Sequence, residues 1–82
     1  MSFVNIGYGN VVNSEKVCSI VSPDAAPIKR LIQTARDQGN AIDGTCGRKT
    51  KAVLIMENQT IVLSSLLPET IAARMNAEDE RR

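Results

Sequence analysis

The chain has 82 residues, the length of one small domain, with a formal charge of +1, no histidine and only one Phe and one Tyr. A chain this short buries only about 60% of its unfolded surface, so aliphatic side chains must form the core and self-association is a natural source of further burial. No apolar run approaches the ~20 residues of a membrane span, and the first residues do not resemble a signal peptide. The expectation is a soluble, cytoplasmic protein with no membrane partner.

Two strands are expected before the first helix. The first comprises residues 3–12 and is interrupted at Gly7–Asn10, where glycine suits the positive φ of a bulge or tight turn. Asn13–Glu15 has turn composition, so this segment is expected to form a hairpin with a second strand, Lys16–Val21. Cys18, on the second strand, is interpreted as a small core residue.

A helix is expected from about Asp24 to Gln38. Asp24 is a suitable N-cap, and Gly39 suits the left-handed position just after the helix. Apolar residues with helical spacing form one stripe that should face the core. The stripe consists of Ile28, Leu31, Ile32 and Ala35.

The second half of the chain predicts a hairpin and a short helix. Ala52–Met56 is almost wholly apolar, which is typical of a central strand, and Thr60–Ser64 should return antiparallel to it. Pro68 is expected to open a short helix through about Met75. The order ββαββα predicts an α+β fold: a small antiparallel sheet of two hairpins, one main helix and a short C-terminal helix. Residues 1–75 should form a single domain, and residues 76–82 a charged tail that frays.

The segment Gly44–Lys51 concentrates positive charge. Arg48, Lys49 and Lys51 fall within four residues, without an acid among them and just after two glycines. From Lys16 to Lys51 there are seven cations and three acids, a local surplus that the overall charge of +1 hides. An exposed loop of this kind is suited to phosphate groups, and the scarcity of aromatic residues favours duplex over single-stranded nucleic acid. Because Lys16 and this loop each precede a strand, we expect both along one rim of the sheet.

Catalytic chemistry is not indicated. Without histidine the usual base near neutral pH is absent, and no carboxylates pair at a spacing suited to acid–base work. Asp43 is expected to bond loop N–H groups or to orient Arg48. Thr45 stands where a nucleotide-binding loop needs lysine, and Cys18 and Cys46 lack the spacing of a metal site. We therefore expect no enzyme activity, cofactor, metal or small-molecule substrate.

Several segments together resemble the RemA family, bacterial regulators of extracellular matrix (biofilm) genes. The similarity runs from Phe3 to about Arg74 without obvious gaps. It is carried by residues 3–12, 20–30, 42–53 and 67–71. The resemblance implies a DNA-binding transcriptional activator that assembles into a ring-shaped homo-oligomer, with double-stranded DNA on its basic outer surface.

The resemblance also implies contact residues. In the family, DNA contact is attributed to a basic residue entering the second strand and to arginines of a Gly-Arg-Arg-Thr-Arg loop. These positions correspond here to Lys16, Arg48 and Lys49, with Lys51 matching the last arginine. Lysine retains the charge of arginine but lacks its planar fork, so phosphate attraction is expected to persist with less bidentate contact.

Two other functions stay open at this point: an oligomeric module that binds an acidic protein partner, and an RNA-binding protein. An enzyme that acts on a small-molecule phosphate is a more remote third. The hairpin Ala52–Leu63 and the apolar pair Leu66–Leu67 are the expected sources of the subunit interface, because exposed strand edges invite pairing.

Overall fold

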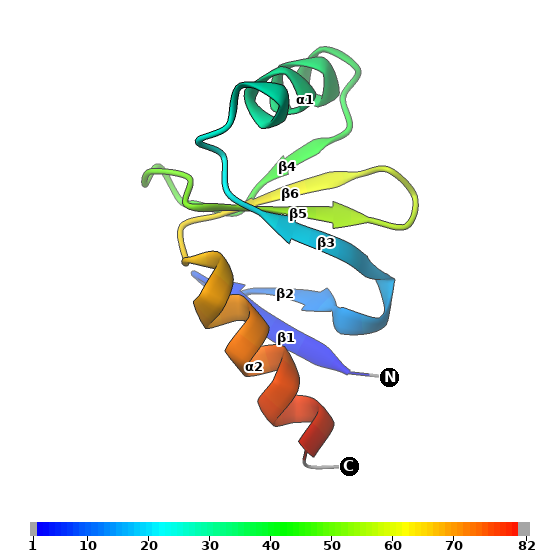
Figure 1. Ribbon diagram of the computed structural model, residues 1–82, viewed down its shortest axis with the longest axis vertical. Helices are drawn as coiled ribbons and strands as arrows, with labels where there is room; N and C mark the ends of the chain where they lie inside the picture. The colour runs from blue at the N-terminus through cyan, green and yellow to red at the C-terminus, as the bar shows by residue number, and fades with distance from the viewer. Residues whose placement is uncertain (1, 81–82) are drawn as a thin grey trace.

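Two β-sheets and two helices make up the computed structural model, which describes residues 2–80 (Figure 1). The α+β class expected from the sequence is confirmed. The elements in chain order are β1 (Phe3–Gly7), β2 (Asn10–Asn13), the 3₁₀ turn η1 (Ser14–Lys16), β3 (Val17–Val21), α1 (Ala26–Asp37), β4 (Ala41–Asp43), β5 (Ala52–Met56), β6 (Ile61–Ser64) and α2 (Pro68–Glu80). Within the described residues, no helix has both the length and the apolar content needed to span a bilayer.

The N-terminal hairpin lies within residues 3–13. β1 and β2 pair antiparallel, and the chain reverses through Gly7, Tyr8 and Gly9, all with positive φ. The tight turn proposed for this segment is thus confirmed, but the hairpin between residues 3–12 and 16–21 is wrong. The side chain of Asn13 accepts a hydrogen bond from the Glu15 N–H at the start of η1, and the chain then enters the other sheet.

The larger sheet has four strands in the order β3-β5-β6-β4. β5 is central and forms an antiparallel hairpin with β6, both as predicted. β4 pairs parallel to β6, which makes this sheet mixed rather than antiparallel. Both strands of the predicted interface hairpin therefore have a neighbour on each side. The free edges of this sheet are β3 and β4, so the expectation that residues 52–63 offer an exposed edge is wrong.

The four-stranded sheet is covered on both faces (Figure 1). Helix α1 packs on one face, where the core consists of Ala35, Val53, Ile61 and Leu63. The β1–β2 hairpin and α2 lie on the opposite face, where Ile6, Leu54 and Ile71 are completely buried. Successive residues of β5 alternate between these two clusters, as side chains along a strand do.

Helix α1 differs from the prediction at its start. The N-cap is Ala25, which makes no side-chain capping bond, so the role assigned to Asp24 is wrong. Gly39 has a φ of 74°, which confirms its predicted left-handed position. The apolar stripe faces the sheet in part: Ala35 is buried and its aliphatic neighbours are half-buried, but Leu31 is exposed.

Two further predictions need correction. Cys18 is exposed rather than buried, because it lies on edge strand β3 where the register with β5 shifts between Val17 and Ser19. Helix α2 continues to Glu80, five residues beyond the predicted end. The fraying proposed for residues 76–82 concerns motion and stays a prediction, and residues 81–82 lie outside the described part of the chain.

Candidate nucleic-acid interface

The basic loop, residues 44–51, begins with a hydrogen-bonded turn. Asp43 Oδ1 accepts bonds from the Thr45 hydroxyl at 2.6 Å and from the Thr45 backbone N–H at 2.9 Å. These bonds, the hydroxyl first, hold the pKa of Asp43 below its ordinary value against a small opposing effect of burial. The Arg48 N–H donates to the Thr45 carbonyl at 3.1 Å. Asp43 therefore orders the loop backbone, the first of the two roles that the sequence suggested.

Strand β6 and the β1–β2 turn anchor the same loop. The Gly44 N–H donates to the Leu63 carbonyl at 2.9 Å. The Asn10 side-chain amide donates to the carbonyls of Gly44 and Gly7, at 3.1 and 3.0 Å. A Cβ added to Gly44 would lie only 3.0 Å from the Leu63 carbonyl oxygen, so glycine allows this close approach. At the other end, the Lys51 N–H donates to the Ser64 carbonyl at 2.8 Å.

The cations of the loop surround an open hollow of about 500 Å³. Its lining residues are Tyr8, Arg48, Lys49, Lys51, Ser65 and Leu66, with no acid among them. The guanidinium carbon of Arg48 lies 5.2 Å from the centroid of the Tyr8 ring, a cation–π contact. The structure thus brings together three of the four predicted site residues, all of them exposed.

On their other side the two lysines border a second hollow, which includes acids. Lys49 and Lys51 line it together with the acids Asp24 and Glu69. The other lining residues are neutral: Ser22, Pro23, Thr50, Leu67 and Pro68. The positive charge of the loop is therefore stronger on the side that faces Tyr8, because the acids on the opposite side partly neutralise it.

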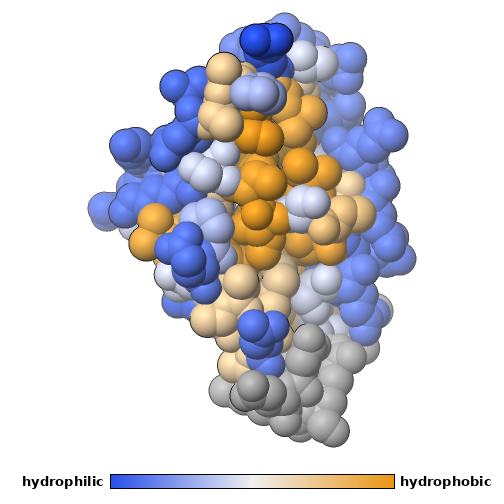
Figure 2. Space-filling view, in the orientation of Figure 1, coloured by the Kyte–Doolittle hydropathy of each residue, from blue (hydrophilic) through white to orange (hydrophobic). Residues whose placement is uncertain are grey.

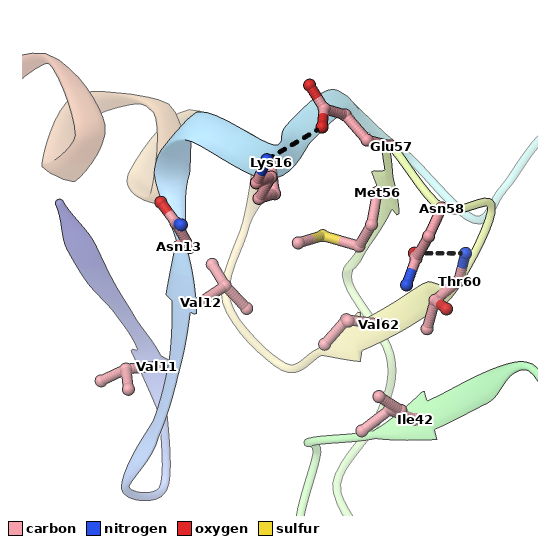
Figure 3. Close-up of a pocket in the computed structure, with 10 residues that line it drawn as sticks. All are labelled: Val11, Val12, Asn13, Lys16, Ile42, Met56, Glu57, Asn58, Thr60 and Val62. Atoms are coloured by element: carbon pink, nitrogen blue, oxygen red, sulfur yellow. Dashed lines mark hydrogen bonds and ion pairs between the residues drawn. The ribbon is translucent and has the colours of Figure 1, made fainter. Parts of the chain in front are cut away.

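The fourth predicted residue, Lys16, lies elsewhere. β3 runs antiparallel to β5, with Val17 opposite Met56 and Val21 opposite Val53. Lys16 is therefore opposite Glu57 at the far end of this ladder, six residues along the β5 segment from Lys51, which is roughly 20 Å at 3.3 Å per residue. Its ammonium pairs with Glu57 at 3.4 Å (Figure 3). Within one subunit, the expected common rim of Lys16 and the loop is wrong, because adjacent antiparallel strands begin at opposite ends.

Near Lys16 the surface is apolar. A groove of about 520 Å³ opens between β2 and the strands β4, β5 and β6, and Figure 3 shows its labelled side chains around one opening. Its apolar lining consists of Val11, Val12, Ile42, Met56 and Val62. Hydrophobic residues gather at the centre of the face that Figure 2 shows. In the groove, Val11 and Ile42 are each 56% exposed. We call this surface the apolar groove.

Sequence reasoning missed two members of the site. Tyr8 and Asn10 were assigned only to a turn, yet the structure places Tyr8 against Arg48 and bonds Asn10 to the loop. An aromatic residue between two glycines was the available signal, but its contact with residues 40 positions away could not be deduced. Among the described residues, no cluster of three potential ligands could hold a metal ion.

Comparison with known proteins identifies the family of this chain. A profile described as "RemA-like: Extracellular matrix regulatory protein A-like" matches residues 3–75, most of the chain. The chain belongs to the RemA-like family. Its similarity to individual members extends over nearly the full length of both chains.

Three relatives illustrate this similarity. A protein of Lachnoclostridium phytofermentans, with only a general regulatory designation, is 58% identical over 93% of this chain and 84% of its own. A similarly designated protein of Geobacillus kaustophilus is 52% identical over 98% and 92%. Extracellular matrix regulatory protein A of Bacillus subtilis is 49% identical over 98% and 90%. These names are regulatory rather than enzymatic, and they indicate a regulatory protein of the RemA type.

Proposed function

We propose that this RemA-like protein is a DNA-binding transcriptional regulator that acts as a ring-like homo-oligomer and activates genes of the extracellular-matrix type. The observation that supports DNA binding best is the basic loop. Its backbone is fixed by hydrogen bonds to Asp43, Asn10 and Leu63, so its cations project from a rigid base. Preorganised cations lose less conformational entropy when they bind phosphate than cations on a mobile segment.

Duplex phosphates are the ligand that these residues fit. Arg48 offers a guanidinium fork, and Lys49 and Lys51 offer compact ammonium groups beside it. Groups of this kind position a protein on the DNA backbone without reading bases directly. Sequence preference would then come mainly from the spacing of contacts and the shape of the duplex.

Self-association is part of the proposal because one subunit offers too few cations for tight binding. Each neutralised phosphate adds to affinity, and several loops on one duplex add through effective concentration. We propose that a second copy of the chain covers the apolar groove. The exposed Val11 and Ile42 at its rim lie on β2 and β4, each paired on one side only within the described subunit. Lys16 lines the same groove, so a DNA contact by Lys16 requires that its ammonium stays at the outer edge of the subunit junction.

The DNA-binding proposal can be tested by titrating a promoter-length duplex with the protein from low to physiological salt, beside Arg48→Ala. Three loop phosphate contacts give a slope of log K against log salt of roughly −3, and a steeper slope needs several subunits on one duplex. We expect Arg48→Ala to weaken binding to all duplexes and to make the slope shallower. Equal affinity and slope for the two proteins would remove the loop from the site.

Oligomerisation needs its own measurement. The mass in solution, from light scattering, should exceed that of one chain and should fall in Ile42→Glu, which places a charge in the apolar groove. Thr34→Glu, at an exposed position of α1, is the matched control and should leave the mass unchanged. A monomeric wild-type protein would contradict the ring, and an unaltered mass in Ile42→Glu would exclude the groove as the interface.

A further inference from the structure

The β1–β2 turn and the basic loop form one composite surface, although they are far apart in the sequence. Asn10 bonds Gly7 of the turn and Gly44 of the loop with the same amide group. The turn also lies against the segment that connects β6 to α2. A Cβ on Gly7 would be 3.6 Å from Leu66 and 3.8 Å from the Ser65 hydroxyl of that segment. The turn is therefore held in place on both sides of the hollow.

Tyr8 occupies an unusual backbone position at the tip of this turn. Its φ is 55°, in the left-handed region where residues other than glycine are uncommon. Its flanking residues Gly7 and Gly9 share the positive φ at no steric cost. The backbone alone would therefore favour a third glycine at this position. What tyrosine adds there is its side chain. That side chain is half-exposed, and its ring lies beneath the Arg48 guanidinium.

The ring limits the directions that Arg48 can take. A free arginine samples many rotamers, whereas a guanidinium stacked on an aromatic ring keeps its N–H groups around the edge of the stack. Those groups border the hollow together with Lys49, Lys51 and the Ser65 hydroxyl. Cations and hydroxyl donors without an acid among the lining residues form a suitable environment for one phosphate group.

We propose that this hollow receives a backbone phosphate of the duplex and that Tyr8 is the positioning residue that holds Arg48 for this contact. The inference rests on the proposed DNA-binding function and adds to it a second segment of the chain. The contribution of the ring is the cation–π interaction, which corresponds to about two- to fivefold in affinity for each contacting subunit.

The test is a double-mutant cycle on duplex affinity with Tyr8→Leu, Arg48→Ala and the combined variant. Leucine is a suitable replacement because, like tyrosine, it is neither glycine nor β-branched, so the cost of the turn changes little. We expect Tyr8→Leu to weaken binding by about two- to fivefold per contacting subunit and to have no further effect in the Arg48→Ala background. Tyr8→Phe retains the ring and should bind as the wild type does.

Phe3→Leu is the matched control, since Phe3 is the other aromatic residue and is 54% exposed at the far end of β1. It should bind DNA normally, and light scattering should give one mass for all variants. Full affinity of Tyr8→Leu beside a weakened Arg48→Ala would overturn the positioning role while the proposed function survives. An additive effect in the combined variant, or a Tyr8→Phe as weak as Tyr8→Leu, would also overturn it. If Arg48→Ala itself binds normally, the basic loop is not the DNA site and the role of Tyr8 falls with it, whereas only a wild type that binds no duplex would overturn the proposed function.

Discussion

The two ends of the β3–β5 ladder both carry exposed cations, but in different surroundings. At one end Lys16 pairs with Glu57 beside the apolar groove. At the other end Arg48, Lys49 and Lys51 border a hollow whose lining includes no acid. A lysine with a carboxylate neighbour attracts phosphate less than one without, because the local field is partly cancelled. From this comparison we expect the neighbours of a cation, more than its presence, to decide whether it can serve as a phosphate contact.

Removing lysines at each end tests this comparison most directly. The double variant Lys49→Ala/Lys51→Ala loses two contacts and should weaken duplex binding roughly 100-fold at moderate salt, at about tenfold per charged contact. Lys16→Ala removes a charge that Glu57 already offsets, so we expect less than about a threefold loss. Mobility shift at matched salt gives both values. Equal losses per lysine at the two ends would refute the distinction.

The junction at Gly44 makes the loop end rigid, and a methyl group there should disturb it. In Gly44→Ala the new Cβ meets the Leu63 carbonyl and the Asn10 amide. We expect about 1–3 kcal/mol less stability in denaturant unfolding, together with weaker DNA binding, because backbone must shift.

Gly39→Ala is the control that separates a loss of stability from a loss of DNA binding. Gly39 has a φ of 74° and open space around its Cα, so alanine there costs about 1–2 kcal/mol through backbone conformation alone. It lies just after α1, at the opposite end of β4 from Gly44, and should leave DNA affinity unaltered. Normal DNA binding by Gly44→Ala would show that the geometry of the loop does not depend on this junction.

The sequence predicted the local elements better than their pairing. The apolar run of β5, the hairpin to β6 and Gly39 after α1 follow from composition and turn chemistry, which act over a few residues. The pairing of β3 with β5 and of β4 with β6 depends on contacts between distant segments, which one sequence does not reveal. The same limit explains the site: the charge density of the loop was visible, but the partner of Arg48 and the Glu57 neighbour of Lys16 depend on tertiary packing.

Removing the carboxylate partner of Lys16 tests the same comparison between the two ends of the ladder, with a smaller expected effect. Glu57→Gln removes the offsetting carboxylate while keeping the size of the side chain. Since an exposed ion pair contributes only about 0.2–1 kcal/mol, we expect duplex affinity to rise by about twofold per subunit. Affinity in low salt, beside the wild type, measures this. A rise comparable with the loss in the loop variants would mean that Lys16 is an equal contact.

The smallest expected effect is a loss of stability at low pH, when Asp43 beside the basic loop becomes protonated. Hydrogen bonds from Thr45 hold the pKa of Asp43 below its ordinary value, with a lesser contribution from Arg36. The folded state therefore binds this proton less readily than the unfolded state does. The resulting stabilisation is complete above the unfolded pKa, about 3.9, and is lost as pH falls through the folded pKa.

Asp43→Asn has no such titration, although its amide oxygen can still accept a bond from the Thr45 N–H. The difference in stability between wild type and Asp43→Asn, from thermal unfolding, should be constant from pH 7 to 5 and shrink below pH 4. A difference that does not change with pH would show that the Thr45 bonds do not favour the carboxylate over the protonated acid.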